Sequence, residues 1–454
     1  MNAFPPLPKA FVERMRVQLG GESEAFFAAL EASSQRGIHM NPRKPLPLGD
    51  EPDGLLEPIP WEPNGYWLSA ESQAGSHPIH EAGAYYLQEP SAMIPTRILA
   101  PQPGERVLDL CAAPGGKSIQ LADMLMGQGL LVCNEPVSSR AAVLSRNVER
   151  MGLWGTLVVC ADPDQLARVW SQAFDAILVD APCSGEGMFR RHPETRLQWQ
   201  ENSPAGCGSR QRRILASAHQ LLRPGGRLVY STCTFSPEEN GEMIAWFRGE
   251  YPDMKPMEFS VPMGDDCFEF SKDGLLQVYP HRIRGEGHFV AMLGKENLPS
   301  DSAPFLPPGQ ALRPPSPLQL DAFRGFLGRA DENAGEPLLP LPNALLGETL
   351  LYAPPLPPLG GIKVLRAGLH LGSLKGKSFV PDHALALGLD APYSFPTVSL
   401  FHASARAYQR GETLPMEDAP GGFVLMTYHG IALGWAKGND GQLKNHYPKG
   451  LRRP

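Results

Sequence analysis

The middle of the chain alternates short apolar runs with longer mixed stretches. This alternation extends from Arg106 to about Lys295 and is typical of a mostly parallel sheet with helices on both faces. Seven strands are expected there, at residues 107–110, 130–133, 157–160, 176–179, 227–230, 275–279 and 289–293. The segment between the last two is too short for a helical crossover, so they should pair antiparallel at one edge. The pattern predicts an α/β fold with a mostly parallel seven-stranded sheet.

The pattern differs before and after this region. The first part is rich in turns and begins with one predicted amphipathic helix at residues 11–30. Prolines crowd residues 299–317 and 354–360, which favours linkers or loops. The sequence further predicts a helix at 322–327 and short strands at 422–428 and 430–435. We expect four units, at residues 1–95, 96–297, 298–394 and 395–454.

Composition sets limits on this picture. With 454 residues, 42% hydrophobic and 20% charged, the chain should form several domains, and no apolar run approaches the ~18 residues of a membrane span. Its first residues lack the features of a secretory signal, so we expect a cytoplasmic protein. Seven cysteines without a Cys-x-x-Cys pair indicate reduced thiols and no metal site. A net charge of −7 confines any nucleic-acid surface to local basic clusters, such as residues 190–192, 210–213 and 444–453.

A glycine turn follows the first of the predicted strands. Residues 111–117, Cys-Ala-Ala-Pro-Gly-Gly-Lys, should open a helix whose first amides receive a negative or polar cofactor group. The motif completes neither a phosphate-binding nor a dinucleotide-binding glycine pattern. Carboxylates follow the next three strands, at Glu135, Asp162 and Asp180. Each alone is equally well explained as a helix cap, but together they suit the ribose and adenine of an adenosine-bearing cofactor.

Two cysteines lie in turns after later strands, in Asp180-Ala-Pro-Cys183-Ser-Gly and Ser231-Thr-Cys233-Thr. Most free cysteines are small buried hydrophobes, which suits Cys111, Cys133 and Cys160. Cys183 and Cys233 differ because they lie in polar turns at the ligand-binding edge. Near a methyl sulfonium, a thiolate can add to carbon 6 of cytosine and make carbon 5 nucleophilic, while a second acid–base group assists proton loss and release. Covalent catalysis is therefore expected.

These three motifs resemble the signatures of the RNA cytosine-C5 methyltransferases, the Nop2/NSUN and RsmB/RsmF family, and they occur in the expected order. Residues 59–67, 86–91 and 441–450 are similar to the RsmF branch of 16S rRNA methyltransferases. The resemblance covers nearly the whole chain. It implies a Rossmann-like class I methyltransferase core, a small N-terminal α/β unit that contacts RNA, a small ferredoxin-like region, and a PUA-like β domain at the C-terminus.

The resemblance also implies roles for single residues. Cys233 would attack carbon 6, Cys183 would assist proton removal and release, and Asp180 would bind the cytosine edge near Lys117. DNA cytosine methyltransferases use the cysteine of the Pro-Cys turn, here Cys183, but the additional Thr232-Cys233 turn favours RNA and Cys233. The implied cofactor is S-adenosylmethionine, with contacts at Cys111, Ala112, Ala113, Pro114, Gly115, Gly116, Lys117, Glu135, Asp162 and Asp180.

The implied product is 5-methylcytidine in 16S rRNA, either naked or in the 30S subunit, formed by a monomer. Family members with the same motifs modify tRNA, so tRNA is an alternative substrate. A catalytically silent RNA-binding assembly factor is the alternative of another class, and the retained cysteines, Lys117 and Asp180 argue against it. Lysines and arginines near the C-terminus accompany Trp435, His446 and Tyr447, which predicts a surface combining phosphate-directed charge with base stacking.

Overall fold

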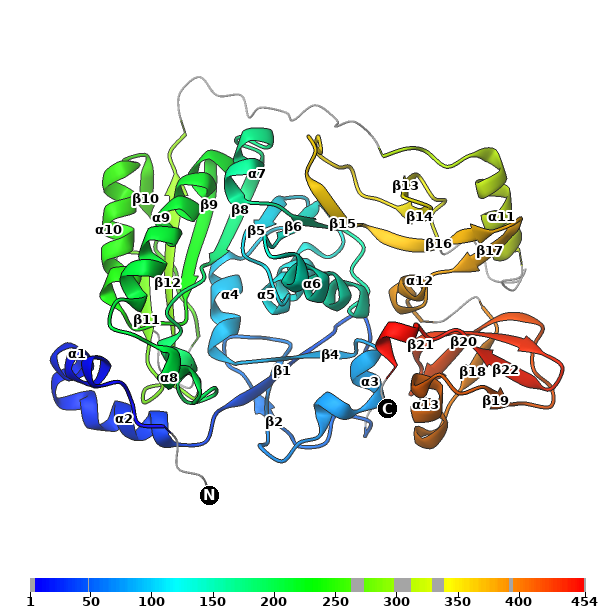
Figure 1. Ribbon diagram of the computed structural model, residues 1–454, viewed down its shortest axis with the longest axis horizontal. Helices are drawn as coiled ribbons and strands as arrows, with labels where there is room; N and C mark the ends of the chain where they lie inside the picture. The colour runs from blue at the N-terminus through cyan, green and yellow to red at the C-terminus, as the bar shows by residue number, and fades with distance from the viewer. Residues whose placement is uncertain are drawn as a thin grey trace.

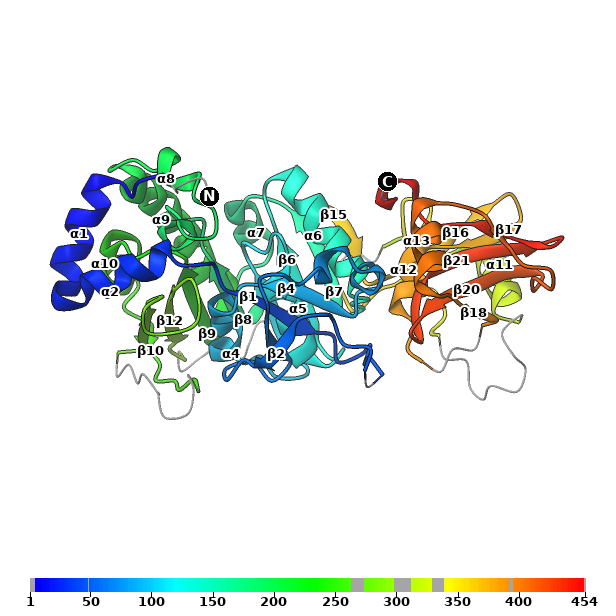
Figure 2. The same ribbon diagram turned by 90° about the horizontal axis from the view of Figure 1, so that it is seen from below.

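The computed structural model describes residues 5–47, 49–262, 273–297, 312–328, 339–391 and 395–452. Four sheets are arranged along an elongated molecule, with the largest near its middle (Figure 1). Viewed from below, the C-terminal strands occupy one end of the long axis, and helices α1 (Lys9–Leu19) and α2 (Ser23–Glu31) lie at the other (Figure 2). None of the helices within these described ranges is long and apolar enough to cross a membrane.

The central sheet contains all seven predicted strands. Its order is β10-β12-β9-β8-β5-β6-β7-β15, with β11 paired to β12. Strands β5 to β9 run parallel, whereas β12 is antiparallel to both β9 and β11, as predicted for the last pair. The predicted strands are β5 (Arg106–Asp109), β6 (Leu130–Asn134), β7 (Thr156–Cys160), β8 (Phe174–Asp180), β9 (Leu222–Thr232), β11 (Leu275–Val278) and β12 (His288–Lys295).

Two strands enlarge this sheet beyond the predicted seven. Strand β10 (Met254–Pro256) joins one edge, and β15 (Lys363–Ala367) pairs antiparallel with β7 at the other. The predicted number was therefore too low, because β15 comes from sequence that we assigned to another unit. Without β15, strand β7, which is buried along most of its length, would present unpaired backbone groups at an edge. An ion pair between Arg366 and Glu149 on α6 holds the added strand.

Helices cover both faces of the central sheet, and alternate strand residues face the two layers. Leu108 and Ile177 belong to the apolar cluster under α7, α9 and α10, while Val107 and Leu131 belong to the cluster under α4, α5 and α6. These helices are α4 (Ile94–Leu99), α5 (Gly116–Leu125), α6 (Ser138–Arg150), α7 (Pro163–Val169), α9 (Ser203–Leu221) and α10 (Gly241–Glu250), and a short α8 (Thr195–Gln198) precedes α9. The predicted α/β fold with a mostly parallel central sheet is confirmed.

The N-terminal unit begins with two helices rather than the single predicted one. Gly20 and Gly21 separate α1 from α2, and the φ of +54° at Gly20 ends the first helix because such a backbone favours glycine. A four-stranded antiparallel sheet of order β2-β3-β1-β4 follows. Its elements are β1 (Arg36–Met40), β2 (Leu55–Pro58), β3 (Gly65–Leu68) and β4 (Tyr85–Gln88), with α3 (Pro78–Glu81) before β4.

The part of the chain after the core contains two more sheets. The first has the antiparallel order β13-β14-β16-β17, with α11 before its strands and α12 after them, in the region for which the resemblance implies a ferredoxin-like fold. The predicted helix at 322–327 lies within α11, whereas most of the proline-rich stretch from 299 lies outside the described residues. The elements are α11 (Pro317–Leu327), β13 (Ala344–Leu346), β14 (Thr349–Tyr352), β16 (Leu369–Lys375), β17 (Ser378–Pro381) and α12 (His383–Gly388).

The last sheet has the order β18-β20-β21-β22-β19 and contains both predicted strands. One of its faces shares an apolar cluster with Ile38 and Tyr85 of the N-terminal unit, and the other packs on Phe326 of α11. The sheet of the N-terminal unit and the last sheet therefore bury each other's apolar residues. The elements are β18 (Thr397–Ser399), α13 (His402–Arg410), β19 (Leu414–Pro415), β20 (Gly422–Tyr428), β21 (Ile431–Asn439) and β22 (Gln442–Asn445).

Candidate active site

The predicted site residues meet at one edge of the central sheet. Cys111, Glu135 and Asp162 follow the carboxyl ends of β5, β6 and β7, Asp180 ends β8, and Cys233 follows β9. In the strand order, β5 lies between β6 and β8. The chain therefore runs from β5 through β6 to β7 on one side of β5 and then crosses back to β8 on the other side. Open α/β sheets bind ligands at such a point, beyond the carboxyl ends of their strands.

The glycine turn provides open backbone at this edge. Gly115 has a φ of +118°, a conformation that favours glycine, and Gly116 begins α5 without a side-chain cap. A Cβ at Gly116 would lie 3.0 Å from a ring carbon of Tyr86 on β4, so the turn packs closely on the N-terminal unit. The first amides of α5 are consequently free of a competing side-chain acceptor, as an anionic cofactor group requires.

The carboxylates after β6 and β7 have different surroundings. Glu135 is buried, lies 3.1 Å from the guanidinium of Arg140 and accepts the Val137 N–H at 2.9 Å. Asp162 is exposed and caps α7 by accepting the Asp164 N–H at 3.1 Å. Both retain acceptor capacity for hydroxyl groups. Together with the open amides of α5, this donor and acceptor set fits the amino-acid and ribose parts of S-adenosylmethionine.

Lys117 and Asp180 form the charged centre of the site. Lys117 Nζ donates to Asp180 Oδ2 at 2.8 Å, and the Ser231 hydroxyl donates to Oδ1 at 2.8 Å. Burial opposes ionisation of Asp180, but the charge of Lys117 and the contact with His288 outweigh it and hold the pKa of the carboxyl well below its usual range. Burial likewise disfavours the charged lysine, yet Asp180 raises the pKa of Lys117. The pair is thus an ammonium–carboxylate pair.

The two cysteine turns bring their thiols together. Cys183 Sγ and Cys233 Sγ are 3.3 Å apart. The Gly187 N–H donates to the Cys233 carbonyl at 2.8 Å, and the hydroxyls of Ser184 and Thr234 are also 2.8 Å apart. Hydrogen bonding to Cys233, reinforced by burial, raises the pKa of the Cys183 thiol well above its ordinary value. Cys183 is therefore held as a protonated thiol beside Cys233.

Two residues that the sequence did not single out support these turns. Glu239 accepts hydrogen bonds from the Ser184 backbone and hydroxyl and from Gln211, and burial raises the pKa of its carboxyl to about 7. Asn240 accepts the Thr232 hydroxyl at 2.6 Å and donates to the Thr234 carbonyl at 2.9 Å. Their signal in the sequence was their position, since both directly follow the second cysteine turn.

The N-terminal helices also contact the first cysteine turn. Arg14 on α1 lies 2.6 Å from Glu186, a buried carboxylate that also accepts the Phe235 N–H at 3.1 Å. Ring contacts join Phe11 to Phe189 and Phe26 to Phe235, with centroids 5.0 and 5.1 Å apart. The first two helices are therefore part of the wall that supports both thiols.

Two predicted RNA-contacting features have a different place in the structure. Arg190 is buried, 2.6 Å from Glu286, so it serves the fold rather than a basic surface. Trp435 is also buried, because both faces of β21 are covered, and Tyr447 is buried just after β22, so neither can stack on bases. His446 and the lysines at 437, 444 and 449 are exposed, while Arg453 lies outside the described residues.

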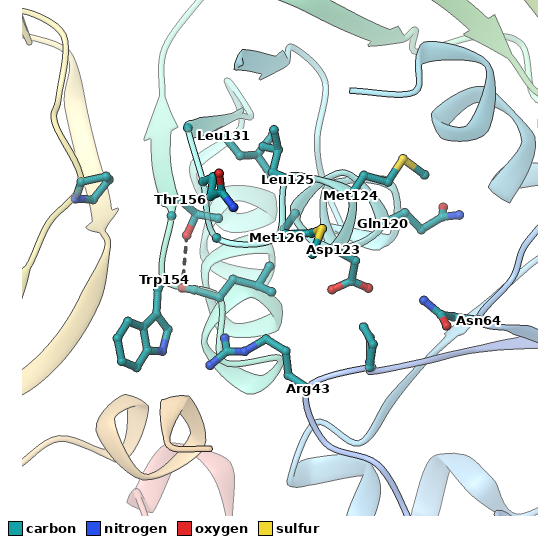
Figure 3. Close-up of a pocket in the computed structure, with 18 of the residues that line it drawn as sticks. Arg43, Asn64, Gln120, Asp123, Met124, Leu125, Met126, Leu131, Trp154 and Thr156 are labelled. Atoms are coloured by element: carbon teal, nitrogen blue, oxygen red, sulfur yellow. Dashed lines mark hydrogen bonds between the residues drawn. The ribbon is translucent and has the colours of Figure 1, made fainter. Parts of the chain in front are cut away.

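A cavity of about 820 Å³ lies away from the thiols, at the junction of three units. Arg43 from the N-terminal unit, Asp123 from α5 and Trp154 near the start of β7 line it (Figure 3). This is the end of the sheet opposite Cys183 and Cys233. Among the described side chains, no group of three or more His, Cys, Asp and Glu residues is placed to hold a metal ion.

Comparison with known proteins matches successive parts of the chain to four family descriptions. These are the N-terminal domain of 16S rRNA methyltransferase RsmF at residues 7–90, 16S rRNA methyltransferase RsmB/F at 96–294, the RsmF rRNA methyltransferase first C-terminal domain at 336–389, and the methyltransferase RsmF PUA domain at 395–453. Three curated proteins named ribosomal RNA small subunit methyltransferase F are similar along the whole chain. They come from Enterobacter sp. (strain 638), Klebsiella pneumoniae (strain 342) and Escherichia coli (strain SE11), with 33%, 32% and 34% identity, each over 98% of this chain and 96% of the relative.

The chain belongs to the RsmB/F family of 16S rRNA methyltransferases. Membership of the RsmB/F family confirms the predicted enzyme class and the predicted cofactor, S-adenosylmethionine. A solved methyltransferase homolog from Pyrococcus horikoshii is 26% identical, with a TM-score of 0.54 over 63% of this chain and 95% of that one. NSun6 from the same organism, solved with SFG, is 21% identical with the same TM-score over 63% of this chain and 98% of that one, and shares the fold.

Proposed function

We propose that this RsmB/F-family enzyme methylates carbon 5 of cytidine in 16S rRNA through a covalent adduct with Cys233. The observation that carries the proposal is the convergence of two thiols, 3.3 Å apart, with the Lys117–Asp180 pair beside an open glycine turn. Carbon 5 of cytosine is a weak nucleophile until a thiolate adds to carbon 6. The site provides a thiol for that addition and a carboxylate for the ring edge.

Cys233 is the proposed nucleophile, and Cys183 is the proposed proton carrier. Addition forms a bond from Cys233 Sγ to carbon 6 while the thiol proton leaves to solvent, and it moves an electron pair toward carbon 5. Bound S-adenosylmethionine supplies an electrophilic methyl group. Because Cys183 is held as a thiol next to Cys233, it can donate its proton to the departing sulfur as the bond to carbon 6 breaks. At the same time the Cys183 sulfur accepts the proton of carbon 5, whose electron pair forms the double bond between carbons 5 and 6, so both cysteines end as thiols.

The Lys117–Asp180 pair is proposed to hold the cytosine edge. The low pKa of the Asp180 carboxyl keeps this group ionised. The carboxylate can therefore accept hydrogen bonds from ring N–H groups of the cytosine and stabilise a protonated adduct. Lys117 fixes the carboxylate from the side of the glycine turn. For the cofactor, we propose the turn from Cys111 to Lys117 with Glu135, Asp162 and Asp180. The buried Glu135 and the exposed Asp162 are suitable acceptors for hydroxyl and amino groups.

The finer features of the partner are also proposals. We propose that the enzyme acts as a cytoplasmic monomer on 16S rRNA in or before the 30S subunit, with units at residues 1–95, 96–297, 298–394 and 395–454. The relatives' names, which specify the small ribosomal subunit, support this substrate. Lys437 and Lys444, exposed on the last sheet, support RNA contact there.

The test is transfer of a labelled methyl group from S-adenosylmethionine to naked 16S rRNA, 30S subunits and tRNA, followed by mapping of 5-methylcytidine. We expect transfer to one of the 16S rRNA forms. Transfer to tRNA alone would replace the proposed substrate, and transfer to no RNA would favour a catalytically silent assembly factor. Light scattering of the same preparation should give the mass of one chain.

The roles of the two thiols are separated by trapping on 16S rRNA that contains 5-azacytidine. Cys183→Ala should still form the covalent adduct, whereas Cys233→Ala should form none. Cys207→Ala, which removes a partly exposed thiol on α9, is the matched control and should behave like the wild type. If Cys233→Ala forms the adduct and Cys183→Ala does not, the two roles are reversed.

A further inference from the structure

His288, the first residue of β12, is a polar residue near the site that the proposed reaction does not use. Its side chain is buried, with 2% of its surface exposed. Neither ring nitrogen has a hydrogen-bond partner among the residues that the structure describes. A buried polar group without a partner destabilises the fold, and an apolar ring of the same shape would avoid that cost. The fold itself gives no reason for an imidazole here.

The imidazole lies next to the proposed base-binding carboxylate. His288 Nε2 is 3.5 Å from Asp180 Oδ1, the oxygen that also accepts the Ser231 hydroxyl. Lys117 occupies the other carboxylate oxygen. The neighbouring residue Phe289 pairs with Thr232, which precedes the nucleophile, so β12 brings the imidazole directly beside the second cysteine turn. Asp180 therefore accepts hydrogen bonds from two elements, and β12 places the His288 ring beside it at 3.5 Å.

The chain before His288 fixes its position. Gly287 has a φ of +99°, and a Cβ there would lie 2.7 Å from a ring carbon of Phe235. The preceding Glu286 is tied to Arg190 by a buried ion pair, and Gln277 on β11 donates to the His288 carbonyl at 3.3 Å. The backbone of His288 is held on both sides, so its ring has little freedom to leave Asp180.

We propose that His288 is a positioning residue for Asp180 in the methyl transfer reaction. With the base bound, the Nε2–H donates to Oδ1 and, with Lys117 and Ser231, holds the carboxylate plane against the cytosine edge. The hydrogen bond from this buried donor strengthens as the bound base excludes water and the cytosine ring becomes protonated. This inference rests on the proposed function of Asp180. It adds a residue outside the cysteine, lysine and aspartate motifs of the sequence.

The test compares His288→Phe and His288→Gln in the full-length enzyme. Phe keeps a planar ring but removes both nitrogens, whereas the Gln side-chain amide can place an N–H donor near the position of Nε2. We expect His288→Phe to lower kcat about tenfold, the usual effect of losing one hydrogen bond to a charged group, with KM for RNA and for S-adenosylmethionine unchanged. The kcat of His288→Gln should recover to within about threefold of the wild-type value. The remaining loss comes from the imperfect hydrogen-bond geometry of the amide.

His383→Phe is the matched control. His383 is also a buried histidine with both nitrogens lacking a hydrogen-bond partner within the described ranges, but it lies on α12, away from the thiols. Its substitution should leave kcat unchanged. If both His288 variants keep wild-type kcat, or if Gln is as slow as Phe, the positioning role is wrong. If the wild type itself transfers no methyl group, the proposed function fails first.

Discussion

The proposed catalytic edge, where Lys117, Asp180, Cys183 and Cys233 meet, and the last β-sheet differ in how well the sequence predicts the surroundings of their residues. At the edge, Lys117, Asp180, Cys183 and Cys233 converge as expected from their positions after strands. In the C-terminal unit, Trp435 and Tyr447 are predicted to stack on bases because basic residues surround them. Both are instead part of the core. A residue in a turn after a parallel strand has its place set by topology. A residue within a strand has its exposure set by what covers the sheet.

The difference has a physical origin in the two layers around β20 and β21. Val424 and Met426 face the N-terminal unit, while Leu425 and Trp435 face α11 and α12. Both faces are buried by segments far away in the sequence, so the strands lack the alternation that would mark an exposed face. The catalytic turns have no such dependence, because the carboxyl ends of parallel strands always share one edge.

With both thiols retained, the largest effect expected at this edge is that of Asp180→Asn. An amide cannot balance the Lys117 charge or accept from a protonated ring as a carboxylate does. We expect kcat to fall about 10³-fold, the upper range for removing one electrostatic group from an active site. Asp162→Asn, which changes the exposed cap of α7, should mainly raise KM for S-adenosylmethionine. Single-turnover rates with saturating RNA provide the comparison, and equal losses in the two variants would contradict the different roles.

The corresponding change in the last sheet is Trp435→Ala, which should act on stability alone. It removes a ring that packs on Phe326 and Phe395 and an Nε1–H that donates to the Asp382 carbonyl at 2.9 Å. We expect a loss of about 3 to 5 kcal/mol in unfolding free energy. Urea denaturation measures this loss, and Trp435→Phe should recover most of it. Weaker RNA binding at unchanged stability would show that the ring contacts RNA after all.

Glu239 links the stability of the catalytic edge to pH. Burial raises its pKa from 4.5 to about 7, so the folded state favours the protonated carboxyl. The stabilisation is complete below about pH 4.5 and is lost as the pH rises through about 7. Glu239→Gln cannot ionise, and the unfolding free energy of the variant relative to the wild type should therefore rise with pH, by at most about 3 kcal/mol.

The measurement for Glu239 is urea denaturation at several pH values between 5 and 8. Glu238→Gln is the control, because Glu238 is exposed on the same turn as the buried Glu239. The control should parallel the wild type at every pH. Parallel curves for Glu239→Gln as well would show that the carboxyl remains ionised throughout, held so by the donors from Ser184 and Gln211.

The sequence predicted the core strands well because their apolar runs are short and clearly bounded. It missed β15, since pairing of Lys363–Ala367 with β7 depends on a partner some two hundred residues earlier, which no local pattern encodes. Within the site, the two cysteine turns are predictable because they are rich in polar residues and follow apolar strands. His288 does not, because a single histidine after Gly-Glu-Gly has no periodicity, and only the antiparallel β12 brings it to Asp180.

The smallest expected effect concerns the exposed lysines of the last sheet. Lys437 on β21 and Lys444 on β22 are directly opposite in an antiparallel pair, and both are exposed. Like charges in this position repel each other, so removing one should stabilise the sheet by a few tenths of a kcal/mol.

If phosphate lies between them in the RNA complex, Lys437→Ala should weaken RNA binding and reduce the slope of log K against log salt by about 1. Fluorescence anisotropy across a salt series measures this slope, with Lys377→Ala as an exposed control. A slope equal to that of the control would show that Lys437 makes no phosphate contact.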